Sequence, residues 1–296
     1  FKIDTHRSFN VPAIARAYLG IDGNKISKVI LSKDFKPFAK AGTNYTAIPG
    51  ICQRKGDYDF ALHHLVRLAF LHQRKNILSQ KAYQKLLFTM LTAKGNKHYK
   101  YFSMGLCGIL KDTENHILMT ETSRYLTNEL LAKYYNNNKL KLPNEFNNNI
   151  NGFHNWMLEH LHELFVDYFN EYNSRPYQGY AIMPLLNLYS FSTNKKVKEA
   201  SKMILDLLST IFAIQSNKGR RSVPFRRQIV YEPLDSIIPG DGEIARHALL
   251  SGELSFYNGE GDSKVINYGT QFMVVSAISD YIIPDFILDL IIKNNH

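Results

Sequence analysis

The sequence predicts an all-α fold built of helical hairpins. Apolar residues recur at helical spacings of three and four in one segment after another, and polar loops separate these segments. The 296 residues are 45% apolar and include 18 Tyr and 18 Phe, which is enough to bury a large core. No regular repeat of about 34 or 40 residues occurs, so a common helical solenoid is not expected.

The first helix is predicted at residues 57–74, with Asp57 as its N-cap. The segment before it is rich in Pro and Gly, so loops are expected there. The next two helices are predicted from Ser79 to about residue 93 and from Thr113 to about Tyr134.

The clearest helical pattern runs from Phe153 to Tyr172. One face of this helix is expected to pack inward and carries Trp156, Met157, His160, Leu161, Leu164, Phe165, Tyr168 and Tyr172. A helix at 177–191 follows, in which Pro184 is expected to cause a kink or to move the start downstream.

Asn194 is the expected cap of a helix at 195–214. Residues 219–269 mix Gly, Pro and short apolar runs, so they are predicted to form long loops. Helical spacing returns at 269–279 and at 284–294, where Pro284 suits a first turn.

The charge balance favours an anionic partner. The chain has 36 Lys plus Arg against 26 Asp plus Glu, a formal charge of +10. Because the lysines are scattered, a solvated surface accounts for much of this excess, and no dense Arg-rich run with aromatics indicates nucleic-acid binding. No apolar run of about 18 residues predicts a membrane span.

No metal or other cofactor is predicted. Cys52 and Cys107 are too few for a structural zinc site, and one disulfide or two buried thiols remain open. His160 is expected in the core, whereas His63, His64 and His154 are expected at the surface. The chain begins at Phe1 without a signal-like segment, so such a peptide has been removed or was never present.

Four stretches together resemble a known architecture: "GDYDFALHHLVRLAFLH", "TENHILMTETSRYLTNELL", "FHNWMLEHLHELFVDYFNEYNSRPYQGY" and "LLNLYSFSTNKKVKEASKMILDLL". They resemble large secreted bacterial proteins with an incomplete α/α-toroid domain, the architecture of many polysaccharide lyases and some glycoside hydrolases. The resemblance covers roughly residues 57–214. It implies one toroid-like domain over 1–296, a secreted or periplasmic location and a polysaccharide partner. A toroid left open and a fragment of a longer chain both remain alternatives.

The resemblance also implies a site. Toroid lyases that act on acidic glycans hold the substrate carboxylate with an Asn, use His and Tyr as base and acid, and often place an Arg nearby. The matching catalytic candidates are Asn115, His116, Tyr172 and Arg124. The substrate-binding candidates are Tyr177 and Arg220 from this set, together with Glu114 beside Asn115 and with Glu171 and Asn173 beside Tyr172. Tyr177 is an alternative to Tyr172 as the acid, and Arg220 an alternative to Arg124.

These residue types suit β-elimination. An amide or a cation that holds a uronate carboxylate acidifies the neighbouring proton, a base removes it, and an acid protonates the leaving oxygen. The competing interpretation is a capped helix start, because Thr113 and Glu114 suit free amides and the helix dipole. Glu121 and Arg124 likewise have the spacing of an ordinary helix-surface ion pair.

A second polar cluster lies in "EYNSRPYQGY", where stacking faces and hydrogen-bonding groups suit a sugar. Two further hypotheses stay open beside the lyase. A glycoside hydrolase would use paired carboxylates, for which Glu114, Glu171 and the acidic loop residues at 241–262 are available. A non-catalytic helical glycan-binding module would cleave nothing.

Overall fold

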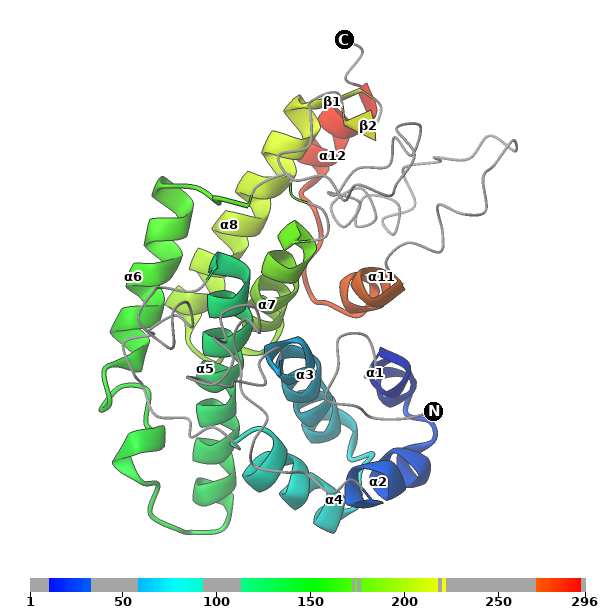
Figure 1. Cartoon of the computed structure of the whole chain (residues 1–296), viewed down its shortest axis with the longest axis vertical. Coiled ribbons are helices and arrows are strands. Elements are labelled where there is room, and N and C mark those ends of the chain that lie inside the picture. Colours follow the sequence, from blue (N-terminus) through cyan, green and yellow to red (C-terminus); the bar gives the residue numbers. More distant parts are fainter. Residues whose placement is uncertain are drawn as a thin grey trace, which may run out of the picture. The chain divides into compact units, whose positions relative to one another are not determined.

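The predicted all-α fold is confirmed by the computed structural model (Figure 1). The structure describes residues 11–32, 58–92, 113–171, 174, 177–217, 220–221 and 270–293. Its α-helices are α1 (Val11–Leu19), α2 (Gly23–Ser32), α3 (Asp59–Lys75), α4 (Gln80–Lys85), α5 (Glu114–Asn137), α6 (Phe153–Val166), α7 (Tyr177–Phe191), α8 (Lys195–Ile214), α11 (Thr270–Ala277) and α12 (Asp285–Lys293). The π-helix η1 (Leu86–Met90) and the 3-10 helix η3 (Asn144–Phe146) are short. Strands β1 (Ser216–Asn217) and β2 (Arg220–Arg221) form one antiparallel pair.

The chain divides into two compact units. The first comprises residues 1–159 and 191–194, and the second comprises residues 160–190 and 195–296. The boundary therefore falls within α6 and near the end of α7. Each unit is described separately below.

In the first unit, α1 and α2 occupy part of the opening that the sequence predicts as loops, so that prediction is wrong for residues 11–32. The helices are short, and positive φ angles at Gly20 and Asp22 turn the chain between them. Gly23 is required by a close approach, because a Cβ there would lie 2.0 Å from the carbonyl oxygen of Ile77.

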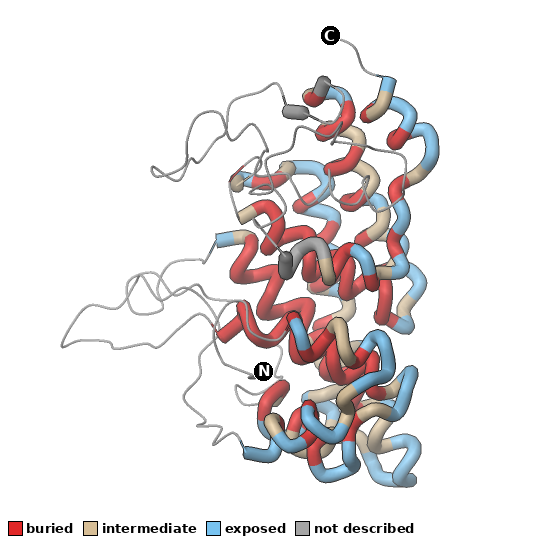
Figure 2. The backbone as a smooth tube through the Cα atoms, turned by 90° about the vertical axis from the view of Figure 1, so that its right-hand side faces the viewer, coloured by how far each residue is buried: buried red, intermediate tan, exposed pale blue. Residues whose placement is uncertain are grey.

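Helices α3 and α5 form the centre of the first unit. They pack against each other along much of their length, and α3 is buried on all sides from Asp59 to His72. Figure 2 shows such unbroken buried stretches beside helices that alternate between buried and exposed residues. A helix buried all round must bury its polar side chains too, so their partners decide whether it is stable there.

The end of η1, which continues α4, is hydrogen-bonded to the residue before α3. The helix predicted to start at Ser79 begins at Gln80, and Ser79 is its N-cap, since the Ser79 hydroxyl accepts a hydrogen bond from the amide of Ala82 at 3.3 Å. The chain continues without a break into η1, and the Tyr58 hydroxyl donates to the Met90 carbonyl at 2.7 Å. The beginning of α3 is thereby fixed by a residue 32 positions away. Tyr58 is the N-cap of α3, and Asp57 lies outside the described residues.

Helix α6 is shorter than predicted. It ends at Val166 because Tyr168 adopts a left-handed φ of 69°. Phe165 and Trp156 were expected to face inward, yet Phe165 is 37% exposed and Trp156 is half-buried. The predicted burial of Met157, Leu161 and other residues of the same face, namely His160 and Leu164, is confirmed.

In the second unit, α7 begins at Tyr177 and includes Pro184 in its interior, so the start is not moved downstream. The predicted bounds of α8 are confirmed. The buried face of α8 consists of Val197, Ser201, Ile204, Leu205, Leu208, Ser209, Phe212 and Ala213, and α12 packs on α8.

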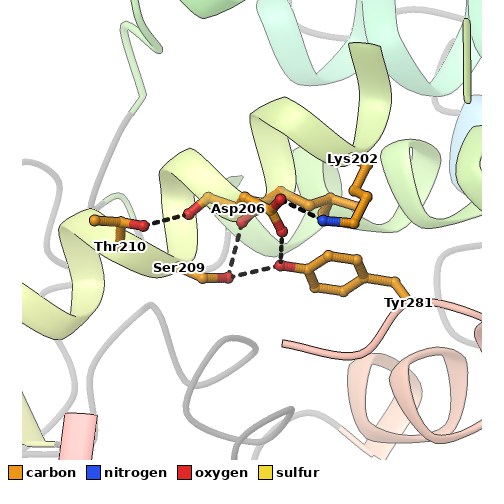
Figure 3. A network of polar contacts seen from close by, with 6 residues as sticks. Lys202, Asp206, Ser209, Thr210 and Tyr281 are labelled. Carbon is orange, nitrogen blue, oxygen red and sulfur yellow. Dashed lines mark hydrogen bonds and ion pairs between the residues drawn. The ribbon is translucent and has the colours of Figure 1, made fainter. Parts of the chain in front are cut away.

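A polar network links α8 to the segment before α12 (Figure 3). The Tyr281 hydroxyl donates to Asp206 Oδ1 at 2.9 Å and lies 3.3 Å from the Ser209 hydroxyl. Lys202 Nζ lies 2.5 Å from the other oxygen of Asp206. Because burial dominates, the pKa of Tyr281 is raised far above its ordinary value, and the phenol stays protonated and able to donate.

Candidate functional site

An aspartate and a histidine from different helices meet at the centre of the first unit. Nδ1 of His116, in the first turn of α5, lies 2.5 Å from Oδ2 of Asp59, the first residue of α3. Asp59 is fully buried, and the His116 side chain is 8% exposed. The Phe60 ring packs edge-on against the imidazole with centroids 5.3 Å apart. The position and orientation of the imidazole are therefore held on two sides.

The contact also selects a tautomer for His116. A carboxylate oxygen accepts hydrogen bonds, so this pairing assigns the hydrogen of His116 to Nδ1, which donates it to Asp59. In the neutral imidazole the lone pair then resides on Nε2. This is the arrangement in which an aspartate orients a histidine for proton transfer at its other nitrogen.

Asn115 precedes His116 and is fully buried. Its Oδ1 accepts a hydrogen bond from the Thr113 hydroxyl at 2.5 Å, whereas its buried Nδ2 has no hydrogen-bond partner. Thr113 is the N-cap residue of α5, but its side chain bonds to Asn115 and not to the helix amides. The predicted helix start is thus confirmed, and the predicted side-chain cap is wrong. The amide of Asn115 is oriented with a donor still available.

Glu121 and Arg124 form the ion pair that their spacing predicts, with Arg124 Nη1 at 2.8 Å from Glu121 Oε1. The pair is not on the surface, since the side chains are 1% and 14% exposed. Burial raises the pKa of Glu121 to about 7, although the charge and hydrogen bond of Arg124 oppose the shift. Glu121 is therefore a carboxyl that changes protonation near neutral pH.

Further polar side chains follow Asp59 along α3. His63 and His64, expected at the surface, are 1% and 0% exposed, so that prediction is wrong. Burial lowers the pKa of His63 to about 4, with Arg67 adding to the shift against a hydrogen bond to the Asp59 carbonyl. Burial also lowers the pKa of His64, and the charges of His63 and Arg67 lower it further against a smaller effect of the Phe60 carbonyl. Both imidazoles are neutral at neutral pH.

The second predicted cluster is described only in part. Tyr172 and Asn173 lie outside the described residues, as do Cys52 and Cys107. Glu171 and Tyr177 are half-buried in the second unit, and Arg220 is described only as backbone in β2. Glu114 is half-buried in the first turn of α5. That Tyr172 or Tyr177 faces His116 stays a prediction.

Asp59 was not among the sequence candidates. It lies 57 residues from His116, and no local spacing links the two positions. The one signal available in the sequence was that Asp59 is the single acidic residue of α3 and lies in its first turn. An acid at that place is equally explained by its favourable interaction with the helix dipole.

Within the described residues, no three His, Cys, Asp or Glu side chains are grouped so that they could hold a metal ion. Of the described helices, none has the length and apolar content needed to cross a bilayer. The chain matches no protein-family model, no curated protein and no solved structure.

Proposed function

We propose that the chain is an exported carbohydrate-active enzyme that cleaves an acidic polysaccharide by β-elimination. The observation that carries the proposal is the 2.5 Å contact between His116 Nδ1 and Asp59 Oδ2. In a folded interior, a buried carboxylate that fixes one imidazole nitrogen leaves the other one suited to removing a proton.

Asn115 supplies the second function that elimination needs. Its Nδ2 is a buried donor without a partner, next in sequence to the proposed base. A uronate carboxylate that accepts this hydrogen bond would be held while the neighbouring carbon loses its proton to His116. The first turn of α5 also presents the positive end of the helix dipole, which favours an anionic substrate group.

The residues proposed for the two remaining roles, the general acid and the assisting arginine, are the candidates identified from the sequence. Tyr172 or Tyr177 protonates the leaving oxygen, and Arg124 or Arg220 assists in neutralising charge. Helix α3 is buried from Asp59 to His72, α5 is buried over most of its first half, and the two meet at their first turns, an arrangement compatible with the inner helices of an α/α toroid. An incomplete toroid is therefore the scaffold that we propose for the chain.

A glycoside hydrolase on the same scaffold is the second candidate, and Glu121 favours it. Hydrolysis needs a carboxylic acid that is still protonated near neutral pH, and the pKa of Glu121 is raised to about 7. A second carboxylate would have to face Glu121 across the glycosidic bond.

The test is incubation of the full chain with a panel of acidic and neutral polysaccharides. Ultraviolet absorbance of unsaturated uronate and new reducing ends are followed together. Both signals are expected for the lyase, whereas reducing ends alone identify a hydrolase. Neither signal, with saturable binding of a glycan, identifies a non-catalytic binding module and contradicts the proposed function.

A further inference from the structure

The turn between α1 and α2 exposes three large apolar side chains that are close together in the sequence. Tyr18, Leu19 and Ile21 are 38%, 66% and 48% exposed. Single exposed apolar residues are normal on a protein surface and need no explanation. Three of them within four positions of one turn form a patch, and such patches mark surfaces that bind a partner.

The backbone of this turn is hydrogen-bonded within itself. The amide of Gly20 donates to the carbonyl of Ala17 at 3.1 Å, and the amide of Ile21 donates to the carbonyl of Arg16 at 2.9 Å. Gly20 permits this ending of α1, because its φ angle is 75°. Since these backbone groups are already paired, the turn can leave water without the cost of burying unpaired amides and carbonyls.

Cations lie beside the exposed apolar side chains. Lys25 Nζ lies 2.9 Å from Asp22 Oδ1, and Arg16 forms an ion pair with the other oxygen of the same carboxylate. The acid of the turn is thus shared between two cations, which leaves a net positive charge. The Lys75 ammonium donates to the Tyr18 carbonyl and lies 4.9 Å from the centre of the Tyr18 ring. We call this group the corner patch: Arg16, Tyr18, Leu19, Ile21, Lys25 and Lys75.

The positive charge extends to the elements that contact α2. The amide of Ser79 donates to the Ser27 hydroxyl at 2.9 Å, and Lys85 Nζ donates to the Leu31 carbonyl at 2.9 Å. Residues 11–32 contain three Lys or Arg and residues 72–92 contain four, against one Asp and no Glu in the two ranges. This part of the first unit therefore attracts anions.

We propose that the corner patch docks the protein onto the surface of an anionic phospholipid bilayer. Leu19 and Ile21 enter the boundary between head groups and acyl chains. The Tyr18 ring lies at the level of the head groups, where aromatic rings with a polar end are favoured. Lys25 and Lys75 contact the lipid phosphates.

The apolar side chains favour a lipid surface over an anionic polymer. A nucleic acid or an acidic polysaccharide would pair with the cations of the corner patch and would leave Leu19 and Ile21 in water. A bilayer surface satisfies both kinds of side chain at once. The inference is independent of the proposed function, because the corner patch contains none of the proposed catalytic residues.

The experiment is sedimentation of the full chain with vesicles of phosphatidylglycerol and phosphatidylcholine in equal parts, and with vesicles of phosphatidylcholine alone. The wild type is expected to sediment with the anionic vesicles and much less with the neutral ones. Binding should weaken as the salt concentration rises, because salt screens the attraction between the cations and the lipid surface.

The decisive variant is Leu19→Ser/Ile21→Ser, which removes the inserted side chains and keeps every charge. It should bind the anionic vesicles about tenfold more weakly or worse. The matched control is Leu140→Ser/Ile150→Ser, which makes the same exchanges at residues of the same unit that are 54% and 61% exposed. This control should bind like the wild type. Lys25→Gln should weaken binding by about fivefold.

Equal binding of the wild type and Leu19→Ser/Ile21→Ser to anionic vesicles would overturn the inference, as would the absence of vesicle binding by the wild type. Binding of duplex DNA or polygalacturonate by a wild type that does not bind vesicles would also overturn it and would identify a polymer-binding surface. If circular dichroism shows that the double variant does not fold, Leu19→Ser takes its place with Leu140→Ser as the control, and the same outcomes decide.

Discussion

His116 Nδ1 lies 2.5 Å from Asp59 Oδ2, and this contact joins the first turns of α5 and α3. The carboxylate fixes both the ring and the nitrogen that carries the hydrogen. The chemistry proposed for this chain depends on that relationship more than on any other.

Asp59→Asn should preserve the size of the buried side chain and disturb the tautomer of His116. The amide can donate to Nδ1, which would move the imidazole hydrogen to Nε2 and remove the lone pair needed for proton abstraction. Turnover is expected to fall by a factor of about 100 to 10,000. Nitrogen NMR of the labelled imidazole should show the changed tautomer, and Asp289→Asn, which alters an exposed aspartate, is the matched control. Full turnover in Asp59→Asn with an altered tautomer would refute the role of Asp59.

Glu121→Gln should remove a pH dependence of stability. Glu121 has a folded-state pKa of about 7 against an ordinary value of 4.5, so the unfolded chain ionises first as pH rises. The stability that Glu121 contributes is therefore present below about pH 4.5 and is lost as pH rises through 7. The free energy of unfolding of the wild type relative to Glu121→Gln should fall by roughly 3 kcal/mol across this window. Urea unfolding of both proteins at several pH values measures the difference, and a constant difference would contradict the assigned pKa.

His63→Gln should reveal the opposite slope. The pKa of His63 is lowered from 6.5 to about 4, so the unfolded chain takes up the proton first as pH falls. The wild type should lose roughly 3 kcal/mol of unfolding free energy relative to His63→Gln between about pH 6.5 and pH 4. Comparing each variant with the wild type is essential, because Glu121 and His63 act in opposite directions over an overlapping range. An unchanged difference over the acid range would show that His63 is not protonated on unfolding.

Tyr281→Phe should destabilise the second unit. It removes the donor to Asp206 at 2.9 Å and the contact with Ser209, with a cost of about 1–3 kcal/mol because the acceptor is charged. Thermal unfolding of Tyr281→Phe, Asp206→Asn and the double variant measures the coupling. Strictly additive effects would mean that the two side chains do not interact.

The sequence was most informative where a helix has one buried and one solvated face. The bounds of α8 were predicted correctly because charged residues such as Lys195 and Glu199 alternate with an apolar stripe. Helix α3 has no solvated face over most of its length. His63 and His64 were therefore wrongly predicted to be exposed on the basis of their polarity.

The sequence predicted only those residues of the candidate site that are neighbours along the chain. Asn115 and His116 were found from their place at the head of a helix, whereas Asp59 was missed because tertiary packing alone brings it to His116. The short helices α1 and α2 were missed because the Pro and Gly residues at 37–50 led to a loop prediction for the whole opening. No local pattern shows that Gly23 lies against Ile77.

The most direct test of the central claim compares the wild type, His116→Ala and His162→Gln on the acidic polysaccharide that gives the largest absorbance of unsaturated uronate. The wild type and His162→Gln should produce it at equal rates, and His116→Ala should be slower by a factor of about 100 or more while its circular dichroism spectrum is unchanged. Equal rates in all three proteins, or no unsaturated product from the wild type on any acidic glycan, would contradict the proposed function.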